Sequence, residues 1–387
     1  MKPTRQICKR VIVIAGETSG DCHGAHLVRA MREKDPGLSF SGIGGERLAA
    51  EGLDLVMDAH ELSVVGITEV FAKLPKVLAA VSAIKRMLRQ DRPALVILID
   101  FPDFNLHIAR HAHKQGVPVL YYISPQIWAW RSGRIQKIRQ YVDQMAVILP
   151  FEADYYRRRN VSATFVGHPL LDYYQEPAEP GAQEKGAGLT VGLLPGSRYG
   201  EIGKNLPIML AAATRIRTGV ADTLPDIRFQ VSVAPGIDRE WMEAFVQPYA
   251  SNCPITLFSG PVREVFEHSE LILAASGTVT LETAIFGVPM IIIYRISPVS
   301  YYLGRALVNV DHIGLVNIIA GERVVPELIQ DAANPPEIAR TATALLKDPE
   351  KRKQVRARLQ SVRHRLGTPG AAARTADIAL GMLDFRR

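Results

Sequence analysis

Residues 271–294 read LILAASGTVTLETAIFGVPMIIIY. The stretch begins with an apolar run of strand length, Leu271 to Ala275, and ends with another, Met290 to Tyr294. Between them, Thr278 to Phe286 has the composition of a helix, and Pro289 breaks the chain before the second run. The pattern therefore predicts a strand, a turn, a helix and a second strand, which together form a βαβ unit.

The turn of this unit, Ser276-Gly277-Thr278, opens the predicted helix. Backbone N–H groups at a helix N-terminus lack partners within the helix and bind anions, most often phosphate. Glu282 lies about one turn into the helix, where its carboxylate can accept hydrogen bonds from vicinal hydroxyls such as those of a ribose. An ordinary packing turn with Glu282 on a solvated face explains the same residues equally well, so this stretch alone leaves both interpretations open.

The same alternation of strands and helices runs through both halves of the chain, which begin with strand-like runs at Val11 to Ala15 and Leu189 to Leu194. It predicts an α/β fold of GT-B type, with two Rossmann-like, doubly wound parallel-sheet domains facing each other across a cleft. We expect a first domain over residues 1–173, a Pro- and Gly-rich linker over 174–188 and a second domain over 189–350. Helices from about residue 350 are expected to pack back on the first domain.

The chain has 387 residues, 47% hydrophobic and 22% charged, as in a globular protein large enough for two domains. No apolar run reaches membrane-spanning length, the basic N-terminus leads into a strand-like run, and the three cysteines show no metal-ligand spacing. We therefore expect a reduced cytoplasmic protein. The net charge of +7 suits nucleic acid, an anionic membrane or phosphorylated substrates. We expect no nucleic-acid partner, because no aromatic-rich basic module or zinc-finger spacing is present.

A glycine-rich segment containing Glu17 and Ser19 follows the first predicted strand. Its glycines, Gly16, Gly20 and Gly24, recur every fourth residue, which differs from the dinucleotide fingerprint G-x-G-x-x-G. A nicotinamide or flavin role thereby loses its main support. What remains is a turn at the carboxyl end of a strand, where open α/β sheets bind ligands.

Two carboxylates follow the predicted strand Ala94 to Ile99. Asp100 is at the strand end that faces the ligand crevice of a parallel sheet. Asp103 suits the N-cap of a helix over Asn105 to Gln115, whereas no such structural role accounts for Asp100. Asp100 is therefore the better candidate for a general base.

Two of the three tryptophans, Trp128 and Trp130, lie beside Arg131 and Arg134 after the next predicted strand. Tryptophan faces can stack on sugars and arginines can hold phosphates. A tryptophan pair also commonly closes a core, and that interpretation stays open here.

An unusually apolar connection precedes an amphipathic helix that carries Lys73 and Lys76. If exposed, this apolar segment would suit acyl chains or a bilayer surface with a basic rim. The residues expected to make that contact are Val64, Val65, Ile67, Val70 and Phe71.

Five motifs in chain order resemble the lipid-A-disaccharide synthase family, a branch of the GT-B glycosyltransferases, along nearly the full chain. They are Ala15 to Asp21 (AGETSGD), Ile99 to Asn105 (IDFPDFN), Ser124 to Arg131 (SPQIWAWR), Leu194 to Arg198 (LPGSR) and Asn317 to Gly321 (NIIAG). Each motif alone is weak, whereas all of them in the correct order and spacing are highly specific. The βαβ unit over residues 271–294 also resembles the nucleotide-sugar half of GT-B enzymes, in which the turn meets the diphosphate and the glutamate meets the ribose.

The resemblance implies an inverting transfer of a 2,3-diacylglucosamine unit from UDP to the 6-hydroxyl of 2,3-diacylglucosamine 1-phosphate. This reaction releases UDP and forms the β-1,6 disaccharide of lipid A biosynthesis. The resemblance also implies that Asp100 is in the motif that carries the base and that Arg198 is needed for activity. The residues expected to bind substrate are Glu17, Ser19, Gly20, Asp103, Asn105, Trp128, Arg131, Ser197, Ser276, Gly277, Thr278, Glu282 and Asn317.

The chemistry of the residues agrees with such a transfer. Inversion needs one base on the acceptor side and no covalent intermediate, and Arg198 with the turn at Ser276 can stabilise the leaving diphosphate. No D-x-D-like signature is present, so we expect neither a metal nor another cofactor.

Because both implied substrates are diacylated and anionic, we expect peripheral contact with the anionic inner-membrane surface. The oligomeric state stays open, with a homodimer among the alternatives. The competing functions are a UDP-sugar 2-epimerase or a transferase to a soluble acceptor, both of the same fold, and a non-catalytic two-lobed binding protein.

Overall fold

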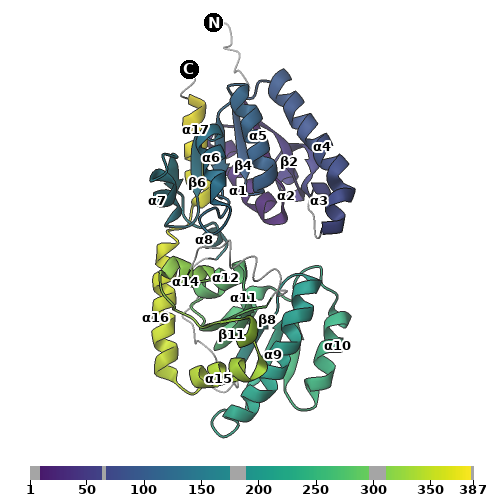
Figure 1. The fold of residues 1–387 in the computed structure, drawn as a ribbon, viewed down its shortest axis with the longest axis vertical. Coiled ribbons are helices and arrows are strands. Elements are labelled where there is room, and N and C mark those ends of the chain that lie inside the picture. The colour runs from purple at the N-terminus through teal and green to yellow at the C-terminus, as the bar shows by residue number, and fades with distance from the viewer. Residues whose placement is uncertain (1–8, 63–66, 175–188, 296–310, 385–387) are drawn as a thin grey trace. The chain divides into compact units, whose positions relative to one another are not determined.

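The computed structural model describes residues 9–62, 67–174, 189–295 and 311–384, with the backbone alone for residues 67–73. The chain divides into two compact units, each built on its own parallel sheet (Figure 1). Unit 1 comprises Met1–Tyr173 with Leu366–Arg387, and unit 2 comprises Tyr174–Arg365. The two parallel-sheet α/β units confirm the predicted fold class.

The sheet of unit 1 has seven parallel strands in the order β3-β2-β1-β4-β5-β6-β7. Strand β1 pairs with β2 on one side and with β4 on the other, so that Val11 lies between Phe40 and Leu95. The strands are β1 (Lys9–Ala15), β2 (Leu38–Gly44), β3 (Leu53–Asp58), β4 (Leu95–Ile99), β5 (Val119–Tyr122), β6 (Gln144–Val147) and β7 (Ala163–Phe165).

Helices cover both faces of this sheet, which explains why β1 and β4 present apolar residues to both faces. Val11 and Val13 pack on one face with α1 and α17, whereas Ile12 and Ile14 pack on the other with α4, α5 and α6. The helices of unit 1 are α1 (Thr18–Lys34), α2 (Glu46–Ala50), α3 (Ala59–Leu62), α4 (Ile67–Gln90), α5 (Pro102–Lys114), α6 (Ile135–Tyr141), α7 (Glu152–Arg157), α8 (Leu170–Tyr173) and α17 (Ala371–Asp384).

The sheet of unit 2 has six parallel strands in the order β10-β9-β8-β11-β12-β13. The strands are β8 (Thr190–Leu194), β9 (Arg228–Ser232), β10 (Ile255–Phe258), β11 (Leu271–Ala275), β12 (Met290–Tyr294) and β13 (Glu327–Ile329). The helices are α9 (Tyr199–Val220), α10 (Arg239–Ala250), α11 (Val262–His268), α12 (Thr278–Ile285), α14 (Leu315–Ala320), α15 (Pro335–Leu346) and α16 (Pro349–Arg365). The strand, turn, helix and strand predicted for residues 271–294 are thus confirmed as β11, α12 and β12.

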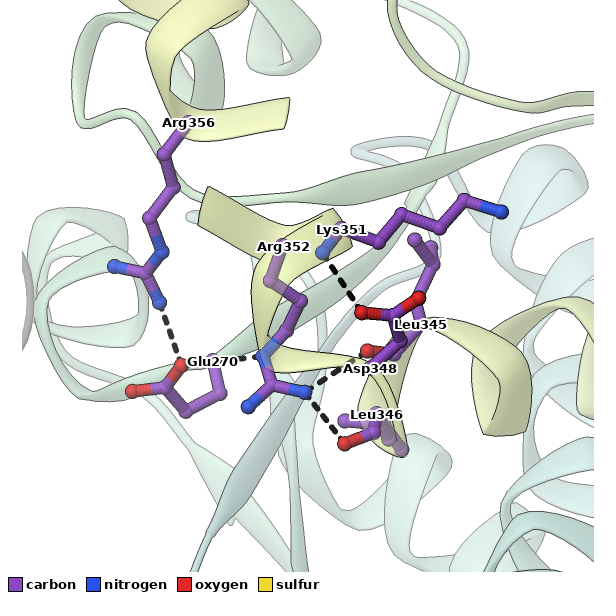
Figure 2. A network of polar contacts seen from close by, with 7 residues as sticks. All are labelled: Glu270, Leu345, Leu346, Asp348, Lys351, Arg352 and Arg356. Carbon is purple, nitrogen blue, oxygen red and sulfur yellow. Dashed lines mark hydrogen bonds and ion pairs between the residues drawn. The ribbon is translucent and has the colours of Figure 1, made fainter. Parts of the chain in front are cut away.

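The basic helix α16 belongs to unit 2, and the chain then enters unit 1 as α17. Figure 2 shows two arginines of α16 beside the carboxylate of Glu270. Arg356 lies 2.5 Å from this carboxylate, and Arg352 lies 3.8 Å from it. Arg352 also donates to the carbonyl oxygen of Leu345 at 2.8 Å. These contacts therefore hold α16 against the rest of its unit.

The expected N-cap was wrong. Helix α5 begins at Pro102, whose missing N–H costs nothing at the first helical position, so Asp103 is inside the helix and is not its N-cap. Helix α1 packs closely at Gly24, where a Cβ would come within 2.9 Å of Leu48 in α2 and 3.0 Å of Ile99 in β4. Asn317 lies in helix α14.

Candidate functional site

A cavity of about 490 Å³ opens at the carboxyl ends of β8, β9 and β11 in unit 2. Ligands of doubly wound sheets bind at this edge. The cavity brings together residues that are about 80 positions apart in the sequence. Among its lining residues are six that the sequence analysis selected: Ser197, Arg198, Ser276, Gly277, Thr278 and Glu282.

The turn before α12 has the form of an anion site. Gly277 is in extended backbone next to the first helical residue, Thr278, and a Cβ on Gly277 would meet no atom within 4 Å. The Thr280 hydroxyl donates to the Gly277 carbonyl oxygen at 2.8 Å and fixes the first turn. The first N–H groups of a helix have no acceptor within it, and the residues that carry them line the cavity.

Glu282 lines the same cavity from the second turn of α12. Burial raises the pKa of its carboxyl group to about 7. The group therefore changes charge near neutral pH, and as a carboxylate it can accept two hydrogen bonds from neighbouring hydroxyls.

A second turn, at the end of β8, presents Arg198 to the cavity. Gly196 has φ of +123°, a conformation that favours glycine, and the Ser197 N–H donates to the Glu201 carboxylate at 3.1 Å. Asn205, buried in α9, donates to the Pro195 carbonyl oxygen at 3.1 Å. Glu201 and Asn205 were not predicted from the sequence; the signal that could have found them is a polar side chain one or more turns into the helix after the Ser-Arg turn.

In unit 1, Asp100 is held in a strained turn at the end of β4. Asp100 and Phe101 both have left-handed backbone, with φ of 46° and 47°. The Asp100 carbonyl oxygen accepts hydrogen bonds from the Tyr121 hydroxyl and the Asn105 amide, each at 2.6 Å. Left-handed backbone costs a non-glycine residue about 1–3 kcal/mol and clusters at functional sites.

The environment of Asp100 suits a base. Burial, together with the smaller effect of the charge of Glu17, raises the pKa of its carboxyl group to about 6, and a hydrogen bond from the Phe101 backbone opposes the rise. Such a group is mostly ionised at pH 7 and still has appreciable proton affinity.

The residues expected around Asp100 divide into two groups. Glu17 and Ser19 are exposed at the N-terminus of α1, where a ligand can reach them. Gly20 is buried against Ala15 and Ile99, and Asn105 is fully buried with its amide bonded to backbone oxygens. These two positions therefore fit packing and positioning roles rather than the direct substrate contact expected of them.

Trp128 belongs to a buried polar network whose centre the sequence analysis missed. The carboxylate of Glu152, 1% exposed, accepts hydrogen bonds from Trp128 Nε1 at 3.0 Å, Ser124 Oγ at 2.6 Å and the Leu149 N–H at 3.0 Å. Burial raises the pKa of Glu152 to about 7, and these hydrogen bonds oppose the rise. The network fixes the loop over residues 124–131, and no pattern around Glu152 distinguishes it from a surface glutamate.

Asp103 lies on the first turn of α5 and forms ion pairs with Arg131, at 3.3 Å, and with Arg134. Trp130, which is 43% exposed, lies against the same arginines, with the Arg131 guanidinium 4.6 Å from its ring centroid. This tryptophan is therefore a surface residue and does not close the core.

Asn317 is fully buried and holds a loop together instead of facing a ligand. Its amide donates to Glu327 at 2.7 Å and to the Val325 carbonyl oxygen at 2.9 Å, and its oxygen accepts from the Val324 N–H at 2.8 Å. The substrate contact expected of Asn317 is thus replaced by a positioning role.

The apolar segment with Val64, Val65, Ile67, Val70 and Phe71 lies outside the residues whose side chains are described. Farther along α4, Leu74 and Leu78 are 48% and 59% exposed. Across the described ranges, no helix has the length and apolarity to cross a bilayer, and no three His, Cys, Asp or Glu side chains are grouped to hold a metal ion.

The sequence profile of a family described as lipid-A-disaccharide synthetase matches residues 11–378. A lipid-A-disaccharide synthase from Syntrophus aciditrophicus (strain SB) is 47% identical over 380 residues, which cover 97% of this chain and 98% of the relative. One from Geobacter metallireducens is 44% identical over 386 residues, 98% of each chain. The chain belongs to the lipid-A-disaccharide synthase family. It is accordingly a glycosyltransferase of lipid A biosynthesis, which confirms the predicted enzyme class.

Solved structures show the same fold at low identity. A calicheamicin glycosyltransferase, CalG4, has a TM-score of 0.59 and 17% identity, with coverage of 98% of this chain and 99% of its own. A putative UDP-N-acetylglucosamine 2-epimerase from Listeria monocytogenes has a TM-score of 0.60 and 13% identity, with coverage of 97% and 96%. At such identities the likeness concerns the fold alone, so it does not favour the epimerase alternative over the lipid-A-disaccharide synthase family.

Proposed function

We propose that this family member transfers 2,3-diacylglucosamine from UDP to the 6-hydroxyl of 2,3-diacylglucosamine 1-phosphate with inversion. The observation that carries the proposal is the cavity of unit 2, which combines an open helix N-terminus, Arg198 and Glu282 in one site. These groups match the diphosphate and the ribose of a UDP-sugar in charge and in hydrogen-bonding capacity.

On the donor side, the turn at Ser276 to Thr278 and Arg198 bind the diphosphate of the proposed donor. Negative charge on the diphosphate grows as the glycosidic bond breaks, so these donors stabilise the transition state more than the ground state. Glu282, as a carboxylate, accepts hydrogen bonds from the ribose hydroxyls.

On the acceptor side, Asp100 accepts the proton of the attacking 6-hydroxyl. A general base of this kind contributes about 10²–10⁴-fold to the rate. Tyr121 and Asn105 act as positioning residues, because they hold the strained carbonyl of Asp100 and touch no substrate in this scheme. The pKa near 6 leaves Asp100 mostly ionised at neutral pH.

We also propose that the enzyme works in the cytoplasm at the inner-membrane surface, through the apolar segment Val64 to Phe71. The exposed Leu74 and Leu78 support this, because they continue the apolar character along α4. Lys76, which pairs with Glu61 at 2.9 Å, adds a basic group beside them. Acylated substrates would then stay in the bilayer during the reaction.

The reaction can be tested with purified protein, UDP-2,3-diacylglucosamine and 2,3-diacylglucosamine 1-phosphate in detergent micelles. We expect stoichiometric UDP and disaccharide, with a β-configured linkage in the NMR spectrum. Omitting the acceptor gives the matched control and should abolish UDP release. UDP release without disaccharide, or a 2-epimer as the product, would contradict the proposal.

A further inference from the structure

A cluster of charged side chains on unit 1 contains one more arginine than a simple ion pair requires. Arg131 and Arg134, here called the arginine pair, share the single carboxylate of Asp103. We propose that the arginine pair is a phosphomonoester subsite, which Asp103 occupies as an internal counterion until the phosphate of the acceptor sugar displaces it. The subsite rests on the proposed function for the identity of its ligand.

The charges favour such an exchange. Two guanidinium groups face one carboxylate, so the cluster keeps a net positive charge with Asp103 in place. The Asp103 side chain is 78% exposed, and an ion pair this exposed contributes at most about 1 kcal/mol. A phosphomonoester carries a charge of about −1.5 to −2 and three acceptor oxygens, and it can engage both planar guanidinium groups at once.

Contacts other than the Asp103 carboxylate also hold the two arginines in place. The Arg134 side chain is only 11% exposed, and its guanidinium lies 5.7 Å from the Trp130 ring centroid. Arg131 has left-handed backbone, with φ of 55°, and its carbonyl oxygen accepts from the Arg134 N–H at 3.0 Å. Strained backbone of this kind clusters at active sites and ligand clamps.

The position of the cluster assigns it to the acceptor. The Tyr121 hydroxyl bonds to the Asp100 carbonyl oxygen at 2.6 Å. Arg134 pairs with Asp103, which is three residues after Asp100 in the chain. Asp103 lies at the positive N-terminal end of α5, which begins two residues after Asp100. A sugar with one hydroxyl at Asp100 can therefore present its phosphate to the arginine pair, while the donor diphosphate has its own site in unit 2.

The decisive experiment compares two acceptors, 2,3-diacylglucosamine 1-phosphate and the same lipid without the phosphate. In Arg134→Ala, KM for the phosphorylated acceptor should rise about 10- to 100-fold, as expected for a lost hydrogen bond to a charged group. KM for the dephosphorylated acceptor should stay within about twofold. Arg131→Ala should show the same pattern and guards against misfolding of Arg134→Ala, because Arg131 is more exposed. The matched control is Arg157→Ala, since Arg157 pairs with Asp154 on the surface at 2.7 Å.

A binding measurement keeps the subsite testable without catalysis. Glucosamine 1-phosphate should quench the fluorescence of Trp130, and Trp130→Phe should abolish the signal. Asp103→Asn removes the counterion and should tighten binding about two- to fivefold. If the wild type binds in this way but makes no disaccharide, the proposed function fails and the subsite stands. If Arg134→Ala and Arg131→Ala affect both acceptors equally, or leave glucosamine 1-phosphate binding unchanged, the arginine pair is not a phosphate subsite.

Discussion

The most demanding prediction concerns the pH dependence that Asp100 gives to the reaction. With a pKa of about 6 instead of the ordinary 3.8, the carboxylate becomes protonated on the acid side of neutrality. The ionised fraction falls from about 0.9 at pH 7 to about 0.09 at pH 5, so kcat/KM should fall about tenfold over this range. A carboxyl group with the ordinary pKa would lose less than about 10% of its ionised form over the same range.

Two variants separate this cause from other titrations. Asp100→Asn keeps the shape of the side chain but cannot take a proton, so the rate should fall about 10²-fold or more and the acid limb should disappear. Glu17→Gln removes a negative charge that raises the pKa of Asp100, so the acid limb should move to lower pH. Adding salt should reduce the difference between Glu17→Gln and the wild type, because Glu17 is exposed and its charge is screened.

The pH dependence of the free energy of unfolding tests the pKa of Asp100 independently of the rate. A raised folded-state pKa means that stability is lost as the pH rises from 3.8 towards 6, and that the full loss is present above pH 6. At pH 8, Asp100→Asn should therefore unfold with a free energy up to about 3 kcal/mol higher, since two pKa units correspond to about that amount. Urea unfolding at pH 8 measures this difference.

The assay is the initial rate of UDP release between pH 4.5 and 8.5, at acceptor concentrations well below KM, so that kcat/KM reports the free enzyme. A midpoint below pH 5, or an acid limb that persists in Asp100→Asn, would refute the assignment of Asp100 as the base. In that case Asp103 would be tested next, as the other carboxylate of the same turn.

Glu282→Ala should weaken UDP binding by about 1.5–3 kcal/mol. The affinity of the wild type for UDP should also decline below pH 7, because Glu282 becomes protonated. Calorimetry that shows neither change would reject the ribose contact. Arg198→Ala should lower the single-turnover rate more than it lowers UDP affinity, and the opposite pattern would place Arg198 in ground-state binding only. Glu152→Ala leaves buried donors without an acceptor, so the free energy of unfolding in urea should fall by at least about 2 kcal/mol. An unchanged free energy of unfolding would show that the network is not needed for stability. Replacing Val70 and Phe71 by serine should reduce liposome flotation and activity on long-chain substrates but not on short-chain analogues; equal losses on both would mark the segment as core.

The sequence was sufficient to predict most of the strands and the edge of each sheet that carries the site. In a parallel sheet all carboxyl ends lie at one edge, so the turns at Arg198 and Ser276 were expected to be neighbours, and the cavity brings them together. The roles proposed for Asp100 and Glu282 rest on the same rule together with the family motifs. The strands and turns could be predicted because strand periodicity and turn composition are local properties.

The tertiary structure decided which polar side chains face a ligand and which ones hold the backbone. Asn105 and Asn317 belong to the motifs that resemble the family, yet both are fully buried and bond to neighbouring loops. Glu152 has no motif around it, but it anchors the loop that carries Trp128. Burial and hydrogen-bond partners depend on residues far away in the chain, so local patterns cannot assign them. The sharing of the Asp103 carboxylate by two arginines could not be predicted for the same reason. Both arginines are more than twenty residues away in the chain, and only the packing of the loop over residues 124–134 on α5 brings the charges together.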